Sequence, residues 1–114
     1  MSPIYKICTS AEWREAERAG AYRGSALDHK DGFIHFSTAE QAAETAAKHF
    51  AGQRDLVLVT VETDALGEKL KWEPSRGGAL FPHVYGTIPA TAARWVKPLP
   101  FQDNVHAFPP EIAG

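Results

Sequence analysis

The part of the sequence that most constrains the fold is an alanine-rich stretch that closely precedes a run of β-branched residues. Its apolar residues recur at the spacing of one helix face, and they are Ala39, Ala42, Ala43, Ala46, Ala47 and Phe50. A capping box can start the helix, with Ser37 or Thr38 as the capping residue, and Gly52 follows its end. The pattern predicts a helix over residues 39–51. Because the stripe is mostly alanine, we expect the helix to approach a sheet closely.

The sheet under this helix should contain the segment LVLVTVET, Leu56–Thr63, which is apolar and β-branched through most of its length. A second helix is predicted at Ser10–Ala19, where Thr9 and Glu12 form a capping box and Gly20 follows. Further short strands are predicted at residues 4–8, 33–36, 70–73, 83–88 and 93–99. Because short turns join the later strands, we predict an α+β fold with a mixed or antiparallel sheet and two main helices packed on it.

Two segments are predicted to lack regular structure. Residues 21–32 are polar and rich in turn formers, and we interpret them as a loop that overhangs a cleft. Residues 98–114 contain several prolines and are predicted to be an irregular tail along the surface. The sequence has no repeat and no internal linker, so residues 1–114 are predicted to form a single domain of ordinary size.

Charge and composition argue against several classes of function. The net charge is −2 and the basic residues are scattered, so we expect no binding of duplex nucleic acid or of an anionic membrane. A single cysteine, Cys8, excludes an internal disulfide and a multi-cysteine zinc site. No metal site is expected, because no HxH, HExxH or CxxC spacing occurs. The N-terminus lacks the pattern of a signal peptide, and we expect a cytoplasmic protein.

Two short strands each present a histidine beside a hydroxyl group. In FIHFST, His35 and Ser37 lie on the face opposite Ile34, because strand side chains alternate. In HVYGTI, His83 and Tyr85 likewise share one face. If the apolar residues face the core, each histidine faces a cleft or solvent.

We expect His35 and His83 to face one shared pocket, with Glu73, Lys6 and Tyr85 near its wall. Burying two unpaired imidazoles in separate places would cost more free energy than placing them together.

Each candidate also has a structural interpretation. A strand histidine is often a hydrogen-bonded structural group, and Ser37 and Thr38 serve as helix caps. Arg76 beside two glycines fits an exposed turn. A zinc site built from His35, Glu73 and His83 is geometrically possible, as is a nucleophilic pair of Cys8 with a histidine, but no spacing supports either.

Three blocks of the sequence resemble the bacterial family known as domain of unknown function 952. They are IYKI with the following TSAEW helix, DGFIHFST leading into a helix, and KWEPSRGGALFPHVYGTI. The last block, in which FPHVYG follows a glutamate and a glycine turn, is the most specific part. Together the blocks cover nearly the whole chain.

The resemblance implies a fold similar to the ADP-ribosyltransferase core, a split two-sheet α+β domain with a cleft for nicotinamide dinucleotide. In that scheme the nucleotide contacts would come from Lys6, Ser37, Thr38 and Arg76, and the chemistry from His35, His83, Tyr85 and Glu73. The sequence departs from the pattern of such transferases in three ways. The threonine that follows the first strand comes one residue late. Lys6 stands where they carry histidine or arginine, and no glutamate starts the last motif strand.

Two classes of function follow from these expectations. The first is an enzyme that acts on a nucleotide, with NAD as a possible substrate and ADP-ribosyl or glycosyl transfer or cleavage as the reaction. The second is a noncatalytic module that binds a nucleotide or a protein and has kept the fold without the chemistry. A metal-free hydrolase that uses the histidines as acid and base ranks third.

Overall fold

The computed structural model describes residues 3–75 and 77–113. Three α-helices are present, α1 (Ser10–Ala19), α2 (Ala26–Asp31) and α3 (Ala39–His49), within this part of the chain. The strands of the same part are β1 (Pro3–Thr9), β2 (Ala21–Tyr22), β3 (Ile34–His35), β4 (Leu56–Glu62), β5 (Leu70–Ser75), β6 (Ala79–Val84), β7 (Ile88–Pro89), β8 (Ala93–Leu99), β9 (Phe101–Gln102) and β10 (Val105–His106). Short 3-10 turns lie at Thr63–Ala65, Gly67–Lys69, Ala90–Ala92 and Pro110–Ala113.

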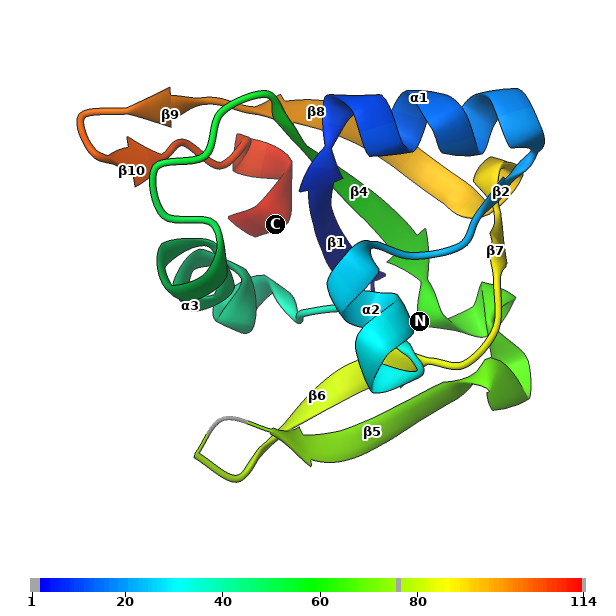
Figure 1. Ribbon diagram of the computed structural model, residues 1–114. Coiled ribbons are helices and arrows are strands. Elements are labelled where there is room, and N and C mark those ends of the chain that lie inside the picture. The colour runs from blue at the N-terminus through cyan, green and yellow to red at the C-terminus, as the bar shows by residue number, and fades with distance from the viewer. Residues whose placement is uncertain (1–2, 76, 114) are drawn as a thin grey trace.

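Two three-stranded sheets form the framework, and their strand orders are β1-β4-β8 and β3-β6-β5. Every strand pairing in the described residues is antiparallel. The two sheets meet where Tyr5 and Ser37 exchange two backbone hydrogen bonds of 2.8 Å each. Figure 1 shows the β5–β6 ribbon projecting below the β1-β4-β8 sheet. The predicted α+β class with antiparallel pairing is confirmed.

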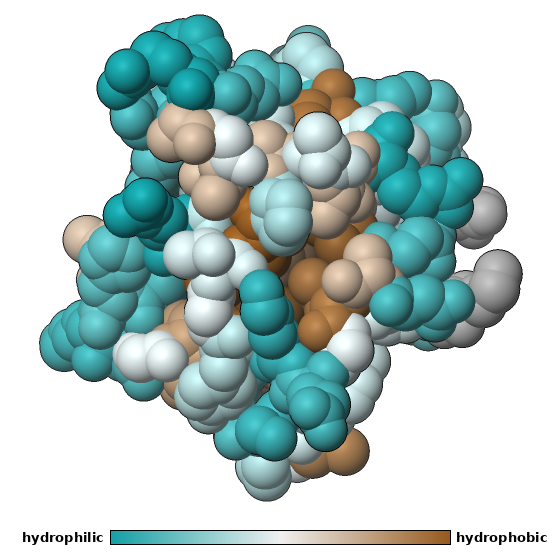
Figure 2. Space-filling model, turned by 90° about the vertical axis from the view of Figure 1, so that its right-hand side faces the viewer, coloured by the Kyte–Doolittle hydropathy of each residue, from teal (hydrophilic) through white to brown (hydrophobic). Residues whose placement is uncertain are grey.

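The β1-β4-β8 sheet is covered by a different helix on each face, because its side chains alternate between the two faces. One core cluster joins Ile4 and Cys8 of β1 to Trp13 of α1. The other joins Tyr5 and Ile7 of β1 to Ala46 of α3. The molecular face shown in Figure 2 is hydrophilic over most of its area, and hydrophobic residues gather in a central hollow, with smaller patches at the upper and lower edges.

The alanine-rich helix packs as predicted but through a narrower stripe. It begins after the N-cap Thr38, whose capping box uses Gln41. Ala42 and Ala46 are buried, whereas Ala43 and Ala47 on the flank of the stripe are exposed. A helix that lies over the edge strand β1 covers little of the sheet, so only the centre of the stripe is buried.

Two segments that were predicted to be irregular have regular structure. Residues 21–32 contain β2 and α2, and a capping box of Ser25 and Asp28 starts α2. Residues 98–114 contain the end of β8 at Leu99, the β9–β10 hairpin and a 3-10 turn. Both predictions were wrong because two-residue strands and a six-residue helix are too short to show a periodic pattern.

Strand boundaries in the histidine regions also differ from the prediction. The strand predicted at 83–88 runs instead over Ala79–Val84 as β6, and Gly86 breaks the chain with φ of +107° before β7. The strand predicted at 33–36 is only two residues long, β3. No helix among the described residues has the length and apolar character needed to cross a bilayer.

Candidate functional site

A cavity of about 510 Å³ contains both sequence-predicted histidines. Its lining comes from β1, the start of α1, α2, β3, the second half of α3 with the loop that follows, and the β5–β6 hairpin. Lys6, His35, Ser37 and His83 belong to this lining. Its volume lies within the range usual for small-molecule sites. A smaller cavity of about 330 Å³ beside Trp95 and Arg94 contains none of the predicted site residues.

His35 and His83 face each other across paired strands. They are direct Cα partners in the β3–β6 ladder, and their ring centroids lie 5.6 Å apart in an edge-to-face arrangement. The ring of Phe33 stacks on His83 at 4.0 Å between centroids. The register of β3 against β6 thus places the two imidazoles next to each other in the cavity lining, as the alternation of strand side chains predicted.

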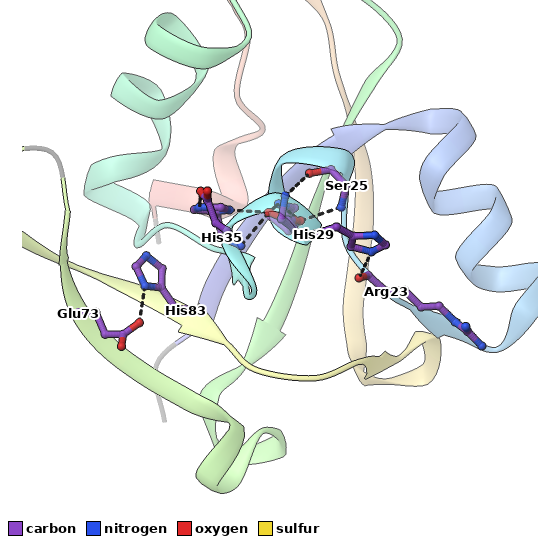
Figure 3. A network of polar contacts seen from close by, with 9 residues as sticks. Arg23, Ser25, His29, His35, Glu73 and His83 are labelled. Atoms are coloured by element: carbon purple, nitrogen blue, oxygen red, sulfur yellow. Dashed lines mark hydrogen bonds and ion pairs between the residues drawn. The ribbon is translucent and has the colours of Figure 1, made fainter.

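The buried carboxylate of Asp28 accepts hydrogen bonds from His35. His35 donates from its backbone N–H at 3.1 Å and from Nδ1 at 2.5 Å to Asp28 Oδ1. The Lys6 ammonium donates to both oxygens of Asp28, at 2.8 and 3.1 Å. The backbone N–H of Ser25 donates to Oδ2 at 2.8 Å. Figure 3 shows how these contacts converge at α2.

The ionised state of Asp28 is strongly favoured by these donors. Burial by itself raises the pKa of Asp28, but the hydrogen bond from His35 and the charge of Lys6 outweigh it and hold the pKa well below its usual range. On the other side of the His35 ring, Nε2 lies 2.9 Å from Asp31 Oδ2. Each nitrogen of His35 therefore has a carboxylate beside it.

His83 has a different partner, the carboxylate of Glu73 on β5. His83 Nδ1 donates to Glu73 Oε1 at 2.7 Å, and the Tyr85 hydroxyl donates to the same carboxylate at 2.9 and 3.1 Å. The hydrogen bond from His83, then that from Tyr85, lowers the pKa of Glu73. The bond to Glu73 raises the pKa of Tyr85. Because Nδ1 is engaged, Nε2 is the nitrogen through which His83 can act on a ligand.

The other predicted residues have varied placements. The Ser37 hydroxyl is hydrogen-bonded to the Thr45 hydroxyl at 2.9 Å within the cavity lining. The Thr38 hydroxyl accepts from Gln41 N–H as the cap of α3. Glu73 contacts His83 and Tyr85, but neither Glu73 nor Tyr85 belongs to the cavity lining among the described residues. Arg76 lies outside the described residues. Burial raises the pKa of the Cys8 thiol to about 12, which does not favour a cysteine nucleophile.

Sequence reasoning missed Asp28 and Asp31, the two carboxylates around His35. The segment DHKDG was interpreted as a loop, so neither residue was placed near the histidine. The capping-box pattern of Ser25 followed three residues later by Asp28 was a usable signal for α2. It would have placed Asp28 and Asp31 at i and i+3, on one side of a short helix.

Comparisons with known proteins agree with this fold. The crystal structure of protein CC0527 from Caulobacter crescentus is 48% identical, with a TM-score of 0.94 over 99% of this chain and 100% of that chain. The solution NMR structure of CC0527 is 50% identical, with a TM-score of 0.83 over 93% and 91% of the two chains. No curated protein matches the chain. A model of one protein family matches residues 7–96, and the chain therefore belongs to that family, described as protein of unknown function, DUF952.

Proposed function

We propose that the cavity binds a nucleotide, with a nicotinamide dinucleotide as the first candidate, and that the protein cleaves or transfers its N-glycosidic bond. The observation that carries this proposal is the pair of imidazoles on adjacent strands that line one cavity, each held by a carboxylate. Carboxylate–imidazole pairs are suited to general acid–base work, because the carboxylate fixes the tautomer and the orientation of the ring.

The sheet arrangement supports the same proposal. Two antiparallel sheets meet at the Tyr5–Ser37 bridge, and the cavity is lined by strands from both of them. This split arrangement is what an ADP-ribosyltransferase-like fold would require. We therefore propose that fold relationship together with the function.

His83 is assigned the role of general base. With Nδ1–H donated to Glu73, the neutral ring keeps its lone pair on Nε2. Nε2 takes the proton of an attacking water or acceptor hydroxyl while the oxygen bonds to the anomeric carbon of the ribose. The bond from that carbon to the nicotinamide nitrogen breaks, and nicotinamide leaves with the electron pair as a neutral base. Asp31 supplies negative charge near the oxocarbenium-like transition state.

The remaining residues predicted from the sequence are assigned roles in positioning the ligand. Ser37 would accept a hydrogen bond from a ribose hydroxyl, and His35 would bond one only by exchanging a carboxylate partner. Lys6 acts through Asp28, because its ammonium is bound to that carboxylate. Arg76 stays a candidate for a phosphate contact, and Thr38 contributes by capping α3 rather than by contact.

The test is nicotinamide release from NAD, followed by chromatography, with binding measured separately by calorimetry. His83→Ala is expected to lower the rate about a hundredfold, the usual contribution of a general base. His29→Ala is the matched control, because His29 is exposed and bonds the Arg23 carbonyl on the other side of α2 (Figure 3). Release that survives His83→Ala unchanged would contradict the assigned role.

A noncatalytic binding module is the second candidate, and the surroundings of His35 favour it. Both of its ring nitrogens already have carboxylates within 2.9 Å, so this ring can exchange a proton with a ligand only by giving up a partner. Under this alternative, wild-type protein binds the dinucleotide and releases no nicotinamide. Binding without turnover would decide in its favour.

A further inference from the structure

The cavity extends well beyond the two histidines. On β1 the lining includes residues from Tyr5 to Thr9. Tyr5 is paired with Ser37, two residues after His35. Four residues of strand span about 13 Å. The lining also follows α3 and the loop after it, where it includes Thr45, Phe50 and Gln53. A ribose and its base held at the histidines would fill only the near half of this space.

The far half of the cavity has a fixed apolar surface and a carboxylate. Phe50 is half-buried and packs against the core cluster that contains Ala46 and Leu56. Glu12, near the start of α1, also lines the cavity. The Ser10 N–H donates to the Asp55 carbonyl at 2.7 Å. This bond ties the loop after α3 to the start of α1, where Figure 1 shows the two passing each other.

Glu12 has hydrogen-bonding capacity to spare. Its Oε1 accepts the Thr9 N–H at 2.8 Å in the capping box of α1. An ionised carboxylate offers about four acceptor sites and no donor. The cap uses one of them, so Glu12 can accept a further hydrogen bond from a ligand in the cavity.

We propose that the far half of the cavity is a subsite for a planar heteroaromatic base that carries an amino group, such as the adenine of a nicotinamide dinucleotide. The inference rests on the proposed function and adds the recognition of the second base. The amino group of the base donates to Glu12, and the ring lies against Phe50. Because Glu12 only accepts, the subsite disfavours a base that has a hydrogen atom in place of the amino group.

The experiment uses calorimetry to compare NAD with its analogue in which unsubstituted purine replaces adenine, since the two ligands differ only in the amino group. Wild-type protein is expected to bind NAD about tenfold more tightly, the value of one hydrogen bond to a charged group. Glu12→Gln is expected to reduce the preference to within about threefold, because a neutral amide oxygen makes a weaker hydrogen bond than a carboxylate. Glutamine also serves at this position of a capping box, so the helix start is retained.

Glu15→Gln is the matched control, because it makes the same change on α1 at an exposed residue paired with Arg18. It is expected to keep the full preference for NAD. A third ligand, nicotinamide mononucleotide, lacks the second base and is expected to bind about tenfold more weakly than NAD.

The outcomes separate this inference from the proposed function. Equal binding of the two dinucleotides by wild-type protein, or a preference that survives Glu12→Gln, overturns the subsite and leaves the proposed function standing. Mononucleotide binding as tight as that of NAD does the same. Failure of all three ligands to bind overturns the proposed function and the subsite together.

Discussion

The two histidines lie side by side on paired strands, but their surroundings are opposite. The side chain of His35 is 30% exposed, whereas that of its partner Asp28 is 1% exposed. The side chain of His83 is 5% exposed, whereas that of its partner Glu73 is 34% exposed. In the first pair the carboxylate is locked in the protein interior with Lys6. In the second the carboxylate is solvated.

This difference in exposure predicts that the Asp28 pair contributes mainly to the stability of the fold, whereas the Glu73 pair contributes little to it. An ionised carboxylate in the interior is tolerated only with its donors in place, so removing its charge is costly. A solvated carboxylate is screened by water, so its loss costs the fold little. We infer that the Asp28 cluster fixes the shape of the site and that the Glu73–His83 pair is free to serve a reaction.

The largest effect on stability is expected from Asp28→Asn. The change leaves the buried Lys6 ammonium without an ionised partner, and breaking such a pair typically costs about 3–5 kcal/mol of unfolding free energy. Urea denaturation measures this loss. Asp31→Asn, on the same helix but partly exposed, is the control and should change stability little. Equal losses for the two variants would show that Asp28 has no special role in the fold.

A smaller loss of unfolding free energy is expected from Gly24→Ala, which adds a steric contact with Asp28 and leaves all charges unchanged. An added Cβ would lie 2.9 Å from the Cβ of Asp28, at a backbone φ of +102°. We expect a loss of about 2 kcal/mol from the strain and the contact together. Gly20→Ala has a similar positive φ and open space around it, so it should lose about 1 kcal/mol. Urea denaturation measures the difference in unfolding free energy between the two variants. Equal losses would argue against tight packing of Gly24 against Asp28.

Acid should weaken the Asp28 cluster in a direction set by its lowered pKa. The group is more acidic in the folded state than in the unfolded state, so its contribution to stability is complete above the unfolded value near 4 and is lost as pH falls below it. Wild-type protein is expected to lose unfolding free energy between about pH 5 and pH 2. The pH profile of Asp28→Asn should be shallower over this window. Parallel profiles would mean that other carboxyl groups cause the acid sensitivity.

The smallest effect on stability is expected from Glu73→Gln, together with a clear effect on the proposed reaction. The carboxylate is partly exposed, so thermal unfolding should shift little. The loss of its charge removes the group that fixes the tautomer of His83, and nicotinamide release should fall about tenfold or more. A variant that unfolds much earlier than wild type would place Glu73 among the structural residues and remove the contrast with Asp28.

The sequence predicted those parts of the fold and site that have local signals. The helices α1 and α3 were predicted because each has a capping box, at Thr9 and at Thr38, and because α1 is followed by Gly20 and α3 has an apolar stripe. The shared face of His83 and Tyr85 followed from strand alternation. The helix α2 was missed because its six residues show turn-like composition rather than a stripe, and its buried Asp28 was missed with it.

The chain therefore determined by itself where α1, α3, β4 and β8 begin and which side chains share a face, since both properties depend on residues a few positions apart. Only the tertiary structure decided which carboxylate each histidine would meet. Asp28 is 7 residues from His35 and 22 from Lys6, and Glu73 is 10 residues from His83. A carboxylate can pair with any nearby donor, and the packing of β1, α2 and the β5–β6 hairpin selects the partner by bringing these segments together and excluding water around Asp28.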